Sequence, residues 1–490
     1  MFGNFAPPIE DYVRILPEII LALCGTLIMF IEGVYKEESH HRPILSWITL
    51  AGLAAALWGT VLAFLTPGTA FSDMIVVDGF ATFFRALVIV VGLLTVLGSI
   101  SYLRQERANA GEYYGLILFS ICGQCVMAAA NELIMVFIGL EISSIATYIL
   151  AGYLRDDKRN NESALKYFLL GSFATAFFLY GIAWIYGITG STNLGEIRLA
   201  LLNKDLGLNM ALVGTAAALM FVGLAFKVSA APFQVWAPDV YQGAPAPVSA
   251  FMSAGPKAAA FAILMRIFVT AFGPIADRWE PYLWFSALLT MIIGNFAALT
   301  QSNIKRLLAY SSIAHAGYVL VAITARSEIG TAAAMFYLAA YAFMNVGAFA
   351  VVTYFARQGE RYVNVDDLGG LGFRRPMVAA MLTIFLLSMI GVPLTGGFFG
   401  KFYIFKAALD SNLIWLTVLG LLNSAVAAYY YLRIIVVMYM HESTDASAEV
   451  GPVSAGLKLT MWASALGTVV LGIFPTLLLN FAGRSSTLAR

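Results

Sequence analysis

The fold of this chain is decided by residues 209–243, which read NMALVGTAAALMFVGLAFKVSAAPFQVWAPDVYQG. The stretch is predominantly apolar and runs 35 residues, whereas about 20 residues of helix suffice to cross the hydrocarbon core of a bilayer. Pro232 removes a backbone N–H near the middle of the stretch and disfavours a continuous helix. We therefore predict a broken membrane helix, with a non-helical turn at membrane depth that lines a polar cavity. The alternative is a simple span followed by an amphipathic stub.

The composition of the whole chain supports a membrane location. Of its 490 residues 60% are hydrophobic and only 12% are charged, while soluble domains carry about 25% charged residues. The net charge of +1 argues against a nucleic-acid partner. Three cysteines all fall in apolar runs, so no disulfide framework is expected. The first residues lack a basic region and a small-residue cleavage site, so we expect no removable signal peptide.

Apolar stretches of spanning length recur along the chain and predict an all-α polytopic membrane protein with about 14 transmembrane helices and no strands. The predicted spans are 13–33, 44–65, 80–103, 113–130, 132–154, 163–187, 209–243, 246–272, 281–300, 306–324, 330–356, 376–408, 412–440 and 458–482.

A second overlong span, 376–408, contains Pro393 and predicts a second broken helix. The two broken helices are the seventh and twelfth spans, so we expect two five-helix repeats, which must be inverted in the membrane because five is odd. The predicted units are an N-terminal three-helix segment at 1–110, a first inverted repeat at 113–272, a second at 281–440, and a C-terminal transmembrane helix within 441–490.

Basic residues in the connections predict the orientation, because Lys and Arg resist translocation. The odd-numbered loops hold about 14 Lys and Arg, and the even-numbered loops and both termini together hold about 7. We expect the odd-numbered loops on the cytoplasmic side and both termini on the periplasmic side.

Five ionisable residues fall near the centres of predicted spans or beside the predicted breaks. They are Glu141, Lys227, Lys257, His315 and Lys401. Placing a charged side chain at the centre of a bilayer costs about 2.5–3.5 kcal/mol, so we expect each of these residues to have a function or a paired group. A low-dielectric cavity lowers the pKa of a lysine and a nearby glutamate raises it, so such a lysine can exchange a proton near neutral pH. A histidine can do so with little adjustment. The alternative for each residue is a structural ion pair or a side chain that snorkels to the interface.

Other charges within the spans are weaker candidates. Lys166 follows Glu162 by four residues, so it is either a member of the proton-exchanging series or half of a helix-surface pair. Asp239 is predicted to line an entrance or to cap a helix start. Residues near span ends are interpreted as structural and able to snorkel; they are Glu18, Glu32, Arg85 and Arg266. The cysteines and histidines form no metal-ligand pattern, and no phosphate-binding loop is present, so no cofactor is expected in this chain.

Three motifs carry a family resemblance: FKVSAAPFQVWAPDVYQGAPAPV at 226–248, SSIAHAGY at 311–318 and GVPLTGGFFGKF at 391–402. These motifs resemble the antiporter-like membrane subunits of respiratory complex I, and the resemblance covers most of the chain, most strongly 113–440. Within this family the chain most resembles the N-type members, as opposed to the L and M types. Three features favour this: the DVYQGAP run, a lysine at position 401, and the lack of room for a long lateral helix.

The resemblance implies a role for each central residue. Glu141 is expected to modulate Lys227, the proton carrier of the first half-channel, while Lys257 connects the halves and Lys401 is the exit-side carrier of the second half. His315 is expected to bridge the halves through water, and Lys166 to be an auxiliary member. One departure concerns Gln234, where family members often have histidine, because glutamine can position water but cannot relay a proton.

The expected function is that of a proton-translocating membrane-arm subunit in a bacterial inner membrane. The resemblance implies that FMN, iron–sulfur clusters and quinone chemistry belong to partner subunits, which include L/M-type antiporter-like subunits and small helical subunits, surrounded by membrane lipids. Three alternatives stay open: the homologous subunit of a multisubunit Na⁺/H⁺ antiporter or membrane-bound hydrogenase, a structural spacer with an inert polar axis, and a stand-alone secondary transporter.

Overall fold

A computed structural model describes residues 7–34, 43–444 and 451–486. Fourteen helices follow the predicted spans, and all but α16 are long and apolar enough to cross a membrane alone, which makes 13 such helices in the described chain. They are α2 (Leu16–Val34), α3 (Pro43–Phe64), α4 (Gly79–Glu106), α5 (Ala110–Ala129), α6 (Leu133–Ala151), α7 (Lys158–Thr189), α9 (Met210–Val228), α11 (Ala246–Met265), α12 (Ala276–Leu299), α13 (Ile304–Thr324), α14 (Glu328–Ala356), α16 (Pro376–Ile390), α18 (Ile414–Met440) and α20 (Ala455–Ile473).

Shorter helical segments connect or extend these spans. They are α1 (Ile9–Arg14), α8 (Leu194–Leu202), α10 (Ala237–Gly243), α15 (Leu371–Arg374), α17 (Gly396–Asp410), α21 (Thr476–Ser485), the 3₁₀ turns η1 (Lys204–Leu206), η3 (Gly273–Ile275), η4 (Gln358–Glu360) and η5 (Val365–Leu368), and the π-helical η2 (Arg266–Ala271). The predicted span at 163–187 begins five residues earlier, because the Asp157 carboxylate caps α7 by accepting the Arg159 N–H at 2.8 Å.

The prediction that the chain contains no strands was wrong at one connection. Between α3 and α4, β1 (Gly68–Ala70) pairs antiparallel with β2 (Ile75–Val77). Lipid-exposed backbone must satisfy itself in helices or closed barrels, but a connection between spans is free of that restriction. Asp11 of α1 accepts the Phe71 N–H of this hairpin at 3.0 Å, which fixes the turn against the N-terminal helix.

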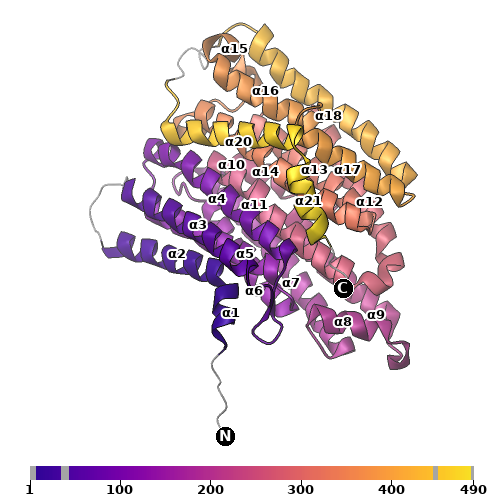
Figure 1. Ribbon diagram of the computed structural model, residues 1–490. Helices are drawn as coiled ribbons and strands as arrows, with labels where there is room; N and C mark the ends of the chain where they lie inside the picture. Colours follow the sequence, from indigo (N-terminus) through magenta and orange to yellow (C-terminus); the bar gives the residue numbers. More distant parts are fainter. Residues whose placement is uncertain (1–6, 35–42, 445–450, 487–490) are drawn as a thin grey trace.

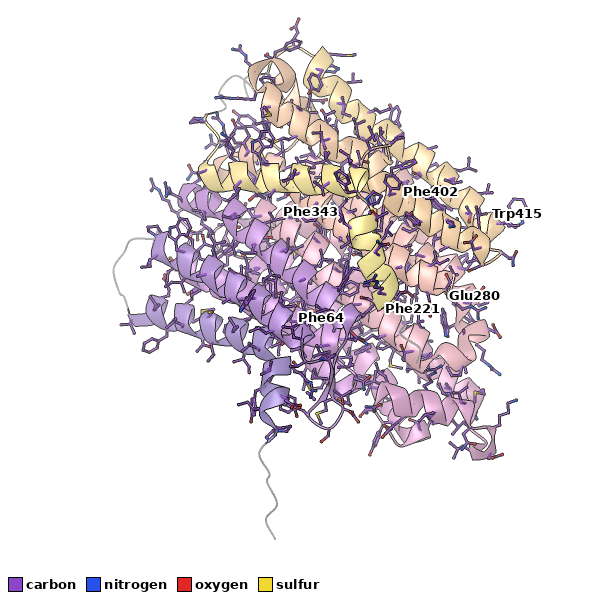
Figure 2. All side chains as sticks on the ribbon, in the orientation of Figure 1. Phe64, Phe221, Glu280, Phe343, Phe402 and Trp415 are labelled. Carbon is purple, nitrogen blue, oxygen red and sulfur yellow. The ribbon has the colours of Figure 1, made fainter. Side chains whose placement is uncertain are left out.

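The most buried helices lie at the centre of the bundle. In α11, α13 and α14 about 94% of the residues in the most apolar stretch of the helix are buried inside the bundle, compared with 28% in α2. The helix α20 lies across the bundle and packs against both α4 and α14, so it joins the N-terminal helices to the later ones (Figure 1). Large apolar side chains cover the periphery, as Trp415 shows where it projects outward from α18 (Figure 2). This surface suits a lipid environment.

The first predicted break is present. Helix α9 ends at Val228, the chain turns through Ser229 and Pro232, and α10 begins at Ala237. Hydroxyl groups of α12 satisfy the freed backbone: Thr290 accepts the Ala231 N–H at 2.8 Å and Ser286 donates to the Ala231 carbonyl at 2.7 Å. Such compensation is what permits irregular backbone at membrane depth.

The second predicted break separates α16 from α17. Gly391 and Leu394 have positive φ angles of 95° and 69°, which end α16 and redirect the chain before Gly396. The two broken helices are thus five spans apart, as predicted. The predicted final span 458–482 is also divided, because α20 ends before Pro475, and α21 continues in a new direction (Figure 1).

Candidate functional site

Lys227 lies in the last turn of α9, immediately before the first break. Its ammonium nitrogen lies 5.0 Å from the ring centroid of Tyr148 and 5.2 Å from that of Tyr167, positions from which both rings attract a cation. Trp236 stacks on Tyr167 with a centroid separation of 4.5 Å, so the ring beside the lysine is held in place. Tyr148 of α6 and Tyr167 of α7 therefore form an aromatic pocket around the lysine, and Trp236, at the end of the break, supports it.

Two polar side chains near this pocket have atoms without partners. Glu141 acts electrostatically on Lys227, and its buried Oε1 atom makes no hydrogen bond within the described residues. Gln234 is 7% exposed, and its Oε1 atom is likewise buried and unpaired among the described side chains. Buried polar atoms of this kind are sites where water binds.

Lys257 lies in the middle of α11 and is 2% exposed. Its Nζ donates to the carbonyl oxygen of Ser312 at 3.1 Å and to the hydroxyl oxygen of the same residue at 2.5 Å. Both acceptors belong to α13, so the lysine connects two of the three most buried helices. No carboxylate pairs with Lys257 in the described residues, which leaves its charge supported by neutral oxygens alone.

His315 lies three residues after Ser312 on α13 and is 3% exposed. Its Nδ1 shares a 2.5 Å hydrogen bond with the Tyr337 hydroxyl, and its Nε2 shares one of 3.0 Å with the Tyr431 hydroxyl. Tyr431 also shares a hydrogen bond with Ser311. Both ring nitrogens are therefore occupied by hydroxyl groups that can donate or accept. The imidazole is within electrostatic range of both Lys257 and Lys401.

Lys401 lies in α17, after the second break, and is 6% exposed. Its Nζ donates to the carbonyl oxygens of Met389 at 2.9 Å and Ile390 at 3.0 Å, and to the Ser424 hydroxyl at 2.7 Å. The Tyr318 ring centroid is 4.7 Å from the same nitrogen. This lysine resembles Lys227 in having an aromatic ring beside it and a helix break next to it.

Lys166 is placed apart from the buried series. Its Nζ lies 2.7 Å from Glu162 and 2.8 Å from Asp239, and its side chain is 42% exposed. Asp239 lies in the first turn of α10 and also binds Arg306 at 2.6 Å. The predicted pair with Glu162 is present, and Asp239 has two cationic partners that lie outside its own loop. Lys166 is therefore part of a surface ion network whose members line one cavity.

Similarity to known proteins identifies the family of this chain. The family model described as NADH:quinone oxidoreductase/Mrp antiporter, TM, matches residues 130–427. The chain belongs to this family. A relative from Solibacter usitatus named NADH-quinone oxidoreductase subunit N 1 is 64% identical, with 97% of each chain covered.

Two solved structures show the shared fold. A chain of respiratory complex I from Thermus thermophilus with bound aureothin is 34% identical, with a TM-score of 0.80 over 96% of this chain and 99% of that chain. A chain of the Mrp complex from Dietzia is 20% identical, with a TM-score of 0.83 over 98% and 97% of the two chains, and this similarity concerns the fold alone. The identities therefore favour the complex I branch of the NADH:quinone oxidoreductase/Mrp antiporter family.

The charged residues of the site were predictable from the sequence, and their neighbours were not. The neighbours that were not predicted are Tyr148, Tyr167, Ser312, Tyr337 and Tyr431. Serine and tyrosine are common within apolar helices, and each of these residues lies on a different helix from the charged residue that it contacts, so no local pattern marks it. Among the described residues, no cluster of three or more histidine, cysteine or carboxylate side chains is suited to a metal ion.

Two arginines interpreted as structural, Arg85 and Arg266, form ion pairs. Arg85 is fully buried, with its Nη2 atom 2.7 Å from Glu18. Arg266 is 6% exposed and binds Asp78 at 2.8 Å, and its Nε donates to the Ala128 carbonyl. Both ion pairs agree with the interpretation of these arginines as structural, and Asp78 is the N-cap of α4 with its side chain 38% exposed, so the Arg266 pair lies at a helix end. Such pairs support the structure without lying on the lysine series.

Proposed function

We propose that this chain is the N-type proton-translocating membrane subunit of an NADH:quinone oxidoreductase, in which the lysine series forms the proton path. The observation that carries the proposal is the arrangement of Lys257, His315 and Lys401, all buried and hydrogen-bonded to hydroxyl groups, with the partly buried Lys227 beside the first helix break and Lys401 beside the second. Intramembrane ionisable residues with such partners are characteristic of proton relays.

In the proposed path each residue has a defined task. Lys227 holds a proton in its aromatic pocket, and the charge of Glu141 sets how readily it does so. Lys257 and His315 pass protons through the hydroxyls of Ser312 and the tyrosines, since a hydroxyl both donates and accepts. Lys401 receives them at the second break. Lys166 is the auxiliary member of this series, at its surface end.

The two halves of the chain are proposed to be inverted repeats, at 113–272 and 281–440. A shared motif supports this division: Ser143-Ser144-Ile145-Ala146 lies in α6 and Ser311-Ser312-Ile313-Ala314 lies in α13. Each is the second long helix of its proposed repeat, and each repeat contains one broken helix as its fourth span. The remaining units are the three-helix segment at 1–110 and the C-terminal helix within 441–490.

The energy for pumping is proposed to come from partner subunits that carry FMN, iron–sulfur clusters and the quinone site. The partners include L/M-type antiporter-like subunits and small helical subunits of the same membrane arm. The odd-numbered loops are proposed to face the cytoplasm, with both termini periplasmic, because the basic residues concentrate in those loops. The setting is the bacterial inner membrane.

The test is NADH-driven proton uptake by membrane vesicles that contain the assembled complex. Lys227→Ala and Lys401→Ala each remove an amine from the proposed path, so we expect proton uptake to fall at least tenfold while the complex still assembles. Normal uptake by both assembled variants would contradict the proposal and would leave a structural spacer as the explanation. Gradient-driven ion exchange by the purified chain alone would instead indicate a stand-alone transporter.

A further inference from the structure

Another buried lysine, Lys305, lies outside the proposed series. It is in the first turn of α13, and its Nζ lies 2.5 Å from Glu360 of η4, in the connection from α14 to α16. The two side chains are 1% and 11% exposed. Lysine is almost never fully buried unless it is paired. A charge in a connection between spans contributes to the orientation without burial, so the burial of Lys305 calls for a separate explanation.

Both members of this pair are held by further hydrogen bonds. Lys305 also donates to the carbonyl oxygen of Ala244 at 2.6 Å. The other Glu360 oxygen accepts the Ala246 N–H at 2.7 Å and the Tyr102 hydroxyl at 3.0 Å. The pair therefore lies against the turn between α10 and α11, immediately after the first broken helix. The pair thus links Lys305 and Glu360, in the second half of the chain, to Ala244 and Ala246 in the first half.

On its outer side the pair borders a polar cavity. Glu360 lines a cavity of about 240 Å³ together with Asp239, Arg306 and Glu162. The Glu162 side chain is 65% exposed, so this cavity reaches the surface of the chain. Glu360 is thus the deepest carboxylate between the cavity and Lys305, and water in the cavity has direct access to it.

On its inner side the pair faces the proposed proton path. Lys305 and Ser312 are seven residues apart on α13, so they share a helix face with about 10 Å between them. Ser312 accepts from Lys257. The Tyr241 hydroxyl has Ser312 as a neighbour and makes no hydrogen bond within the described residues. An unpaired buried hydroxyl at this place is suited to a bridging water.

We infer that Glu360 and Lys305 form a proton-loading site, which passes protons from the cavity to Lys257 through Tyr241 and Ser312. The inference rests on the proposed function. In the resting pair the proton is on Lys305. Its release toward Lys257 leaves a neutral amine beside the Glu360 carboxylate. Glu360 takes a proton from water in the cavity and passes it to Lys305, so one proton enters, one leaves and the pair is restored.

A structural clamp would use the same contacts, and Lys305→Arg separates the two roles. Arginine keeps the positive charge and the ion pair, but it does not release its proton in proteins. We expect Lys305→Arg to lower NADH-driven proton uptake at least fivefold in assembled complexes. Arg266→Lys is the matched control, because it also exchanges one cation for another in a buried ion pair, and we expect its uptake to be unchanged.

A second variant covers the case in which Lys305→Arg does not assemble. Glu360→Gln keeps the shape of the side chain and an oxygen for the Ala246 N–H, but it does not take up protons. Loss of uptake by this assembled variant supports the loading site, and full uptake by either assembled variant overturns it. Lys227→Ala in the same assay distinguishes the two proposals: if it lowers uptake while Lys305→Arg and Glu360→Gln do not, only the loading site fails.

Discussion

The Nζ atom of Lys401 lies 2.9 Å from the carbonyl oxygen of Met389, so the lysine binds the end of the half-helix that precedes its own. The last carbonyls of a helix lack intrahelical partners, and here a side chain from across the break satisfies two of them. The same amine is therefore both a proposed proton carrier and a cap for α16. Loss of its proton would weaken these contacts, which couples the charge on the lysine to the geometry of the break.

Lys401→Arg tests the proposed role of Lys401 as a proton carrier separately from its role as a cap for α16. The guanidinium retains donors for the Met389 and Ile390 carbonyls, but it does not release a proton. We expect proton uptake per NADH oxidised to fall at least tenfold while the amount of assembled complex stays close to normal. Lys401→Met removes the donors as well, which costs about 1–3 kcal/mol for each unsatisfied carbonyl. We expect less assembled complex for that variant, and full uptake by Lys401→Arg would contradict the relay role.

Substitution of Tyr148 tests the aromatic pocket of Lys227. The Tyr148 hydroxyl makes no hydrogen bond within the described residues, so Tyr148→Phe keeps the ring and loses little. Tyr148→Leu removes the ring, and a desolvated cation–π contact is worth up to about 2 kcal/mol, a roughly 30-fold change in the balance between charged and neutral lysine. We expect near-normal proton uptake for Phe and several-fold lower uptake for Leu. Equal damage from both would assign the role to the hydroxyl.

The broken helices could be predicted because length and proline position are properties of one segment. A predominantly apolar run of 35 residues, interrupted by Pro232, has few ways to lie in a membrane. The central charges could be predicted for the same reason, since each is costly where it stands. The hairpin between α3 and α4 could not, because its short strands depend on contacts with α1.

The partners of the charges were not predictable, because they come from other helices. Nothing local marks Tyr431 as a neighbour of His315, 116 residues away along the chain. The burial of Lys305 depends on its ion pair with Glu360, which lies in η4, just after the end of α14. Such pairs arise from the packing of helices, whereas the hydropathy pattern reports only each helix by itself.

The buried pair of Arg85 and Glu18 predicts a non-additive effect on stability. Arg85→Met leaves the Glu18 carboxylate buried without its partner, which costs about 3–5 kcal/mol. The double variant Arg85→Met with Glu18→Gln removes both charges, so we expect it to recover most of that loss. Thermal denaturation of the purified complex measures the difference. If the double variant is as unstable as Arg85→Met alone, the cost comes from lost packing and not from the unpaired charge.

Gly397 is predicted to be required for the second break. A Cβ atom at this position would lie 1.8 Å from the carbonyl oxygen of Ser388, and backbone cannot rotate away as a side chain can. Gly397→Ala therefore forces α17 away from α16. Lys401 lies one turn further along α17, so the same shift separates its Nζ from Met389. We expect a loss of about 1–3 kcal/mol in stability, together with reduced proton uptake in the complex that still assembles.

Gly214→Ala in α9 is the matched control for this glycine, because nothing lies within 4 Å of a Cβ atom at position 214. Alanine in a helix interior is about 1 kcal/mol more favourable than glycine, so we expect this variant to be neutral or slightly more stable, with normal proton uptake. Thermal denaturation and vesicle uptake are measured on both variants side by side. A normal Gly397→Ala variant would show that the break tolerates a wider separation, and that the contact between Lys401 and Met389 is not needed for pumping.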